Sequence, residues 1–111
     1  MTFSVRKDEK GVVVIDVEGQ LIVGNRQELK QKVLDALEAG DRKVLIDFTK
    51  TGYIDSSGLG VLVSLSKKIR DEGGDLRLAG LNEDLKTLFE LTKLDTLFAI
   101  TRTAEEALAA F

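Results

Sequence analysis

Apolar residues are arranged along this chain in two alternating patterns. Short runs rich in Val, Ile and Leu are typical of β-strands, and longer segments with apolar residues every three or four positions are typical of amphipathic helices. The strand-like runs lie at residues 3–5, 12–18, 44–48, 76–79 and 98–100. The helix-like segments lie at residues 25–39, 56–70, 82–92 and 103–110.

The order of these segments predicts the fold class. The first two strands are separated only by a polar turn at 7–11, which predicts a β-hairpin. Strands and helices then alternate, as in right-handed βαβ units with a parallel sheet. We therefore expect an α/β fold in which an N-terminal β-hairpin is followed by βα units, with a central mixed, largely parallel sheet and packed helices.

Polar residues and glycines mark the predicted ends of the helices. Asn25 and Asn82 stand where two helices begin, which is a favoured position for asparagine, and Gly40 stands where the first helix ends. Thr103 and Glu106 have the spacing of a capping box, so a last helix is expected to follow Thr103.

Length and composition limit the possible functions. A chain of 111 residues fits one domain over 1–111, and a net charge of −3 without a basic block gives no footprint for direct nucleic-acid binding. His and Cys are absent, which removes Ser-His-Asp triads, cysteine nucleophiles and the usual zinc ligands. No apolar run reaches the roughly 20 residues of a membrane span. We expect a cytoplasmic, non-enzymatic protein without a cofactor or metal.

The segment 55–60, with the sequence DSSGLG, carries the chemistry that stands out in this chain. It follows a strand-like run and a turn at Gly52, and it opens a helix-like segment. The first N–H groups of a helix are unpaired and the helix dipole favours negative charge there. A serine hydroxyl at this point is reachable and well placed to carry a phosphate.

The sequence IDSSGLGV at residues 54–61 resembles the signature of the STAS domain, found in sulphate transporters and anti-sigma factor antagonists. More narrowly, the chain resembles the stand-alone anti-sigma factor antagonists of bacteria. The resemblance covers nearly the whole chain, because Gly19, the helix around 29–33 and the segment 81–94 follow in the expected order. It implies a STAS-type fold.

The resemblance also implies a partner-switching mechanism. Ser56, directly after Asp55, matches the residue that a partner anti-sigma factor, itself a serine protein kinase, phosphorylates in such antagonists; Ser57 is the less favoured site. Unphosphorylated, the protein would bind the anti-sigma factor; phosphorylated, it would be released, and a PP2C-type phosphatase would reset it.

Several residues around Ser56 are candidate partner contacts, and each has a structural alternative. Asp55 either favours the helix dipole or orients Ser56 and holds the kinase's metal. Ser57 is expected to bond within the first turn. Gly58 and Gly60 either permit close approach of a partner backbone or pack against the chain's own sheet.

Apolar residues near the serine form two further candidate surfaces. The predicted inner face of the helix consists of Leu59, Leu62, Val63, Ser66 and Ile69. Val61 and Leu65 extend the apolar arc beyond that face, and they form either a docking patch or a contact with a neighbouring element.

The segment 20–24 departs from the family pattern, because many antagonists have an acidic residue where this chain has Leu21, Ile22 and Val23. These three residues form either an apolar contact patch or a loop tucked into the core, and the second interpretation is slightly favoured. The departure puts the usual kinase contact in question. The alternative function is a non-catalytic STAS scaffold or assembly subunit of a signalling or membrane-transport complex, and the oligomeric state is left open.

Overall fold

A five-stranded mixed sheet forms the centre of the computed structural model, which describes residues 2–111. Met1, which the predicted domain includes, lies outside the described residues. The strand order is β1-β2-β4-β6-β7; β1 and β2 form the antiparallel hairpin and every other neighbouring pair is parallel. The strands are β1 (Phe3–Lys7), β2 (Val13–Val17), β4 (Lys43–Asp47), β6 (Asp75–Ala79) and β7 (Ala99–Thr101). The predicted fold class is confirmed.

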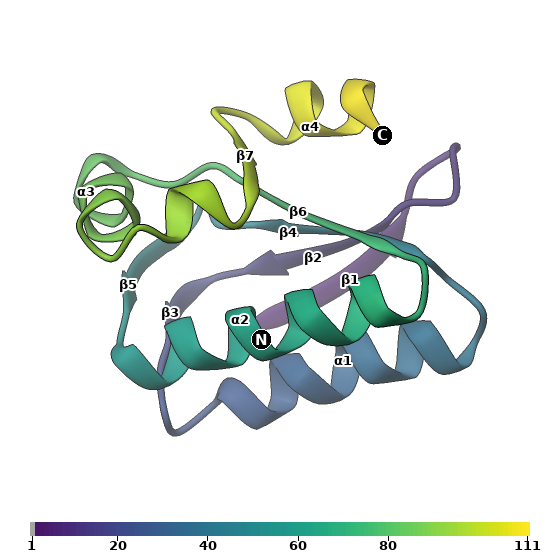
Figure 1. The fold of residues 1–111 in the computed structure, drawn as a ribbon, viewed down its shortest axis with the longest axis horizontal. Helices are drawn as coiled ribbons and strands as arrows, with labels where there is room; N and C mark the ends of the chain where they lie inside the picture. The colour runs from purple at the N-terminus through teal and green to yellow at the C-terminus, as the bar shows by residue number, and fades with distance from the viewer. Residues whose placement is uncertain (1) are drawn as a thin grey trace.

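Helices cover the two faces of this sheet unequally (Figure 1). Helices α1 (Arg26–Glu38) and α2 (Ser56–Asp71) lie together on one face, and the shorter α4 (Ala104–Ala110) lies on the other. Helix α3 (Glu83–Leu91) and a 3-10 turn, η1 (Leu94–Thr96), lie at one end of the strands.

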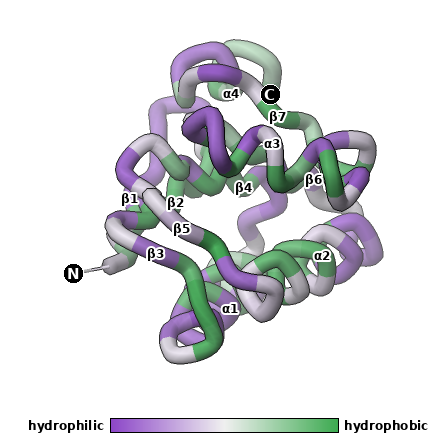
Figure 2. The backbone as a smooth tube through the Cα atoms, turned by 90° about the vertical axis from the view of Figure 1, so that its left-hand side faces the viewer, coloured by the Kyte–Doolittle hydropathy of each residue, from purple (hydrophilic) through white to green (hydrophobic). Residues whose placement is uncertain are grey.

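A second, two-stranded parallel sheet was not predicted. It pairs β3 (Gly19–Leu21) with β5 (Thr51–Ile54), and Figure 2 shows these strands side by side where they lead toward α1 and α2. Strands of three and four residues are too short to show a clear apolar alternation, so the sequence indicated only a turn at Gly52.

Alternate residues of the central strands enter two separate cores. Val13, Ile15 and Val17 face α1 and α2, whereas Val12 and Val14 face α4. The same division in β4 explains its continuous apolar run, since a strand covered on both faces needs apolar residues on both.

Three of the four predicted helix boundaries have the expected geometry. Gly40 follows α1 with a φ of +100°, the side chain of Asn82 accepts a hydrogen bond from the Leu85 N–H at 2.8 Å, and that of Thr103 accepts one from the Glu106 N–H at 3.2 Å.

Asn25 is the exception, because it stands at the N-cap position of α1 without capping the helix. Its Oδ1 accepts a hydrogen bond from the Ile22 N–H and its Nδ2 donates to the Gln20 carbonyl, both at 2.9 Å. Asn25 therefore stabilises the loop before α1, because its side chain bonds backward to that loop instead of forward into the helix.

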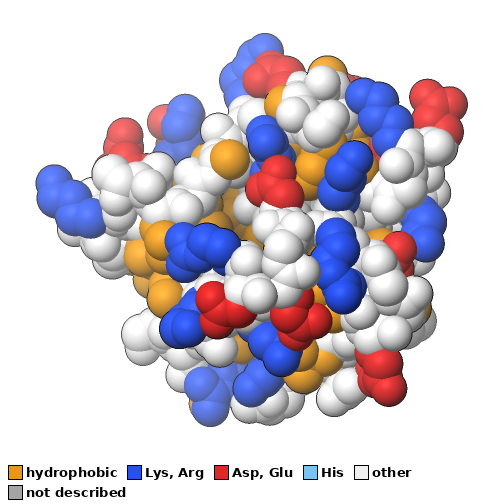
Figure 3. Space-filling view, turned by 45° about the vertical axis from the view of Figure 1, so that its right-hand side comes forward, with side chains coloured by type: hydrophobic (Ala, Val, Ile, Leu, Met, Phe, Trp, Pro, Cys, Tyr) orange, Lys and Arg blue, Asp and Glu red, His pale blue; other side chains and the backbone are white. Residues whose placement is uncertain are grey.

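Charged side chains are dispersed over the surface. Figure 3 shows Lys and Arg interspersed with Asp and Glu on one face, without a large area of a single sign. Within residues 2–111, no helix combines the length and apolar character needed to cross a membrane, and no three metal-ligating side chains gather into a site.

Candidate functional site

Asp55 begins the candidate site, because it links β5 to α2. It is the N-cap of α2, with extended backbone, and its Oδ1 accepts a hydrogen bond from the Gly58 N–H at 2.7 Å. This bond satisfies one of the unpaired N–H groups of the first turn and fixes where the helix begins. Ser56 and Ser57 are consequently the first two residues of the helix.

The second oxygen of the same carboxylate reaches a distant segment. Asp55 Oδ2 accepts a hydrogen bond from the Val23 N–H at 3.0 Å, and the Asp55 N–H donates to the Leu21 carbonyl at 3.1 Å. Asp55 thus joins the loop between β3 and α1 to the start of α2. Neither oxygen is hydrogen-bonded to Ser56, so the suggested orienting of Ser56 by Asp55 is not seen in this geometry.

Ser56 lies on the surface, whereas Ser57 is half-buried. Within residues 2–111, neither hydroxyl makes a hydrogen bond, so the bond expected for Ser57 in the first turn is absent. The backbone N–H groups of these two serines are also unpaired within the described chain. An anion at Ser56 would therefore meet two open donors at the positive end of the helix dipole.

Gly58 and Gly60 differ in their surroundings. A Cβ added to Gly58 would lie 2.6 Å from the Leu21 carbonyl oxygen and 2.9 Å from a methyl group of Ile54, so this glycine packs against the chain's own β3 and β5. A Cβ at Gly60 would meet nothing within 4 Å, and the residue is exposed. Close approach by a partner remains an option for Gly60 alone.

The hypothesis of a docking patch at Val61 and Leu65 is wrong, because these side chains are only 6% and 1% exposed. Both belong to the core beneath α2, as the alternative interpretation proposed. Leu59 is also buried, whereas Val63, predicted to face inward, is exposed. The buried face is rotated from the predicted one because α2 packs against both α1 and the sheet.

The segment 21–23 combines both of its predicted roles. Leu21 is fully buried and Ile22 is half-buried, whereas Val23 is 62% exposed. Tyr53, on β5, is 57% exposed at the same end of the molecule, and sequence reasoning missed it. Accessible apolar surface at this end of the molecule therefore comes from Val23 and Tyr53, and not from Val61 or Leu65.

Comparisons with known proteins agree with this architecture. The family model described as "STAS domain" matches residues 5–107 of the chain. The anti-sigma-B factor antagonist of Bacillus subtilis (strain 168) is 30% identical over 99 residues, which cover 89% of this chain and 90% of that protein.

Solved structures give the same result. The crystal structure of an anti-sigma factor antagonist from Mycobacterium paratuberculosis superposes with a TM-score of 0.86 at 26% identity, covering 98% of this chain and 92% of that one. The phosphorylated form of SpoIIAA, a Bacillus cell fate determinant, superposes with a TM-score of 0.76 at 21% identity, covering 97% of both chains, a likeness that bears on the fold alone.

Proposed function

This chain belongs to the STAS domain family, and from that premise we propose that it is an anti-sigma factor antagonist controlled by phosphorylation of Ser56. The observation that carries the proposal is the position of Ser56, which is exposed at the first residue of α2, directly after its N-cap. The name of the Bacillus subtilis relative supports the antagonist role.

The partner in this proposal is an anti-sigma factor that is also a serine protein kinase. The Ser56 oxygen attacks the terminal phosphorus of ATP bound to the kinase, ADP leaves, and the hydroxyl proton passes to a base of the kinase. The catalytic groups belong to the partner, so the antagonist is a substrate and a binding protein, not an enzyme. We place both proteins in the cytoplasm, and a PP2C-type phosphatase removes the phosphate.

The docking surface in this proposal surrounds Ser56. Val23 and Tyr53 supply exposed apolar area, and Gly60 leaves room for a partner backbone. A phosphate adds about −1.5 to −2 charges at neutral pH beside the Asp55 carboxylate. A partner surface that fits the neutral serine would then bury an uncompensated charge, which lowers its affinity.

Mass spectrometry of the protein from its own host tests the proposal. We expect one phosphate in the peptide that contains 54–67, located on Ser56, and its loss in Ser56→Ala. Ser57→Ala is the matched control, because it removes the neighbouring hydroxyl and leaves Ser56 in place.

The binding half of the proposal needs a separate measurement. We expect the unmodified protein, and not its phosphorylated form, to co-purify with a kinase of the anti-sigma factor class. Phosphate on Ser57 alone would move the site to the neighbouring residue. Absence of phosphate under varied stress, together with no transfer from candidate kinases, would overturn the proposal and favour the scaffold function.

A further inference from the structure

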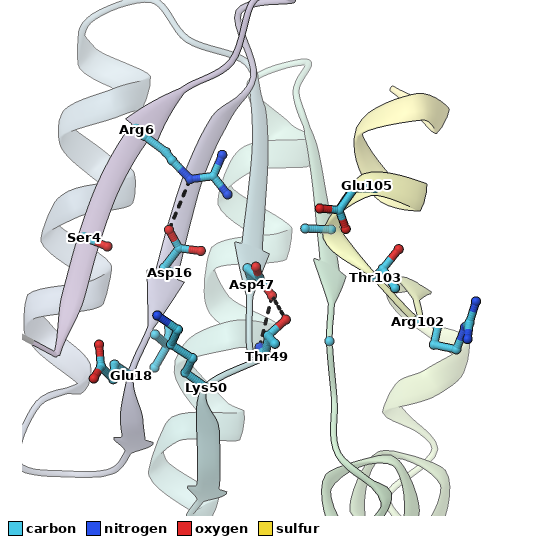
Figure 4. A pocket seen from close by; sticks show the side chains of 13 residues that line it. Ser4, Arg6, Asp16, Glu18, Asp47, Thr49, Lys50, Arg102, Thr103 and Glu105 are labelled. Carbon is cyan, nitrogen blue, oxygen red and sulfur yellow. Dashed lines mark hydrogen bonds and ion pairs between the residues drawn. The ribbon is translucent and has the colours of Figure 1, made fainter.

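Helix α4 covers only part of its face of the sheet, and a polar hollow lies beside it. The hollow has a volume of about 530 Å³, within the range of small-molecule sites. It is bounded by the hairpin strands, the end of β4 and the start of α4 (Figure 4). This face of the sheet is opposite the face covered by α2.

Two carboxylates stand next to each other on the floor of the hollow. Asp16 of β2 and Asp47 of β4 are direct partners in the parallel register, so their side chains point to the same face. Like charges in such a position repel each other. Arg6 neutralises only one of the two carboxylates, because its Nε donates a hydrogen bond to Asp16 Oδ2 at 3.2 Å.

Asp47 is half-satisfied although it is deeply buried. It is only 9% exposed, and its Oδ1 accepts hydrogen bonds from the Thr49 N–H at 3.0 Å and the Thr49 hydroxyl at 2.6 Å. Its Oδ2 accepts no hydrogen bond from residues 2–111, and no cation of these residues pairs with the carboxylate. No buried side-chain oxygen is enclosed without a partner in this part of the chain, so Oδ2 opens to the hollow.

Gly80, directly after the end of β6, maintains this arrangement. It has a φ of +81°, and a Cβ there would lie 2.8 Å from Asp47 Oδ1 and 2.5 Å from the Thr49 hydroxyl. A side chain at this position would displace the Asp47–Thr49 pair, so the backbone itself leaves room for the buried carboxylate.

Charged side chains of both signs line the rim of the same hollow: Lys50 and Arg102 are cationic, and Glu18 and Glu105 are anionic. Lys50 forms no ion pair with residues 2–111, and Arg102 pairs only with Glu106, outside the lining. A purely anionic ligand would be repelled by the two carboxylates on the floor, and a second ammonium group would be repelled by Lys50, which has no ion-pair partner within residues 2–111. A ligand with one ammonium and one carboxylate group satisfies both regions.

From this distribution of charge we propose that the hollow binds a small zwitterion of the amino-acid class, whose ammonium group donates to Asp47 Oδ2 and whose carboxylate faces Lys50. A primary ammonium has three N–H donors, which suits the open oxygen of Asp47 and the adjacent Asp16. The proposal is independent of phosphorylation at Ser56.

Amide NMR titration of the intact protein tests this site. The probes are three amino acids of increasing length, glycine, β-alanine and γ-aminobutyrate, with methylamine and acetate as single-charge controls. We expect saturable shifts of the Thr49 and Gly80 amides with at least one amino acid in the millimolar range, weaker shifts with methylamine, and none with acetate. Saturable shifts with acetate, or none with any amino acid, would overturn the proposal.

Two variants separate the two ends of the ligand. Asp47→Asn keeps an acceptor for Thr49 but loses the negative charge, and it is expected to weaken amino-acid binding at least tenfold. Lys50→Ala changes an exposed residue and is expected to weaken amino-acid binding several-fold without affecting methylamine binding. If Asp47→Asn does not fold, the Lys50→Ala result alone tests the proposed site. Ser56→Ala should bind like the unaltered protein. Unchanged amino-acid binding in Lys50→Ala, or in folded Asp47→Asn, would contradict the assigned contacts.

Discussion

Gly58 and Gly60 lie on the same turn of α2, but they restrict substitution very differently. Gly58→Ala places a Cβ within 3 Å of the backbone and side chains of β3 and β5, so we expect it to lower the free energy of unfolding by about 1–3 kcal/mol. Gly60→Ala meets no neighbour and removes a flexible residue from a helix, so we expect it to raise this free energy by about 0.5–1 kcal/mol.

Urea denaturation of the two variants measures both effects. Equal stability of Gly58→Ala and the unaltered protein would show that β3 moves away from α2 at little cost. That result would contradict the close packing described for Gly58.

Asp55→Asn separates the two bonds of the Asp55 carboxylate. Asparagine caps helices well through its single Oδ1, but its amide nitrogen cannot accept from a second N–H group. We therefore expect the Gly58 amide to remain protected from hydrogen exchange while the Val23 amide becomes exchangeable, with a loss of about 1 kcal/mol in stability.

The control for this variant is Asp55→Ala, which removes both acceptors and should expose both amides. If the Val23 amide kept its protection in Asp55→Asn, the Asp55–Val23 bond would not be what holds the loop.

At the scale of single residues, the sequence predicts that Asp55 lies at the N-terminus of a helix and that the Ser56 hydroxyl is exposed, because the start of a helix is a local pattern. It does not predict the bond between Asp55 and Val23, which are 32 positions apart. That contact depends on the pairing of β3 with β5, which brings the Asp55 side chain to the loop after β3. Pairing between strands far apart in sequence cannot be predicted from a local pattern.

Three side chains at the C-terminal end of α2, Lys68, Asp71 and Glu72, have shifted pKa values. A hydrogen bond from Lys67 lowers the pKa of Asp71, and one from Lys68 lowers the pKa of Glu72. The hydrogen bond to Glu72 also raises the pKa of Lys68. These groups are on the surface, so each pair adds little stability and weakens with salt.

The directions of these shifts fix the pH dependence of the helix end. Because the carboxyl pKa values are lowered in the folded protein, these groups raise the free energy of unfolding at a pH above their unfolded-state pKa. This stabilisation is lost as the pH falls through the folded-state pKa. Because the pKa of Lys68 is raised in the folded protein, its stabilisation is present below the unfolded-state pKa and is lost as the pH rises through the folded-state pKa.

Carboxyl NMR titrations check this dependence. Lys67→Ala should raise the pKa of Asp71, and Lys68→Ala should raise that of Glu72. Each lysine also serves as the control for the other, since its removal should affect the non-bonded carboxylate less. Unchanged pKa values in both variants would mean that these bonds do not persist in solution.

At the scale of elements, long periodic segments are predictable and short strands are not. The apolar arc of α2 was visible in the sequence, but the buried part of the arc depends on where α1 and the sheet lie. Val61 and Leu65 were therefore open to two interpretations until the packing was known.

The whole molecule has two cores of unequal size. The core beneath α1 and α2 contains the four buried phenylalanines, Phe3, Phe48, Phe89 and Phe98. The core beneath α4 is smaller, and the helix contributes only Ala104 and Ala107 as buried residues. Burial of so little apolar surface stabilises α4 weakly.

Hydrogen exchange should reveal this inequality. We expect amides of α4 to exchange at least roughly tenfold faster than those of β4, because α4 can open without unfolding of the sheet. Equal protection of α4 and β4 would show that the molecule opens only as one unit.

At the scale of the whole chain, the order of strands and helices was enough to predict the hairpin and the largely parallel sheet with packed helices. Connection rules determine these features because the alternatives are few. The hollow beside α4 was not predictable, since it arises from the short length of one helix and the register of Asp16 with Asp47.

The exposed position of Tyr53 has a practical consequence. It is the single tyrosine, the chain has no tryptophan, and it lies on β5 close to the start of α2. Ultraviolet fluorescence of the unlabelled protein therefore reports on that end of the molecule alone. With no cysteine in the chain, one introduced thiol elsewhere would accept a second dye, and distances to Tyr53 or to a partner could be followed in real time.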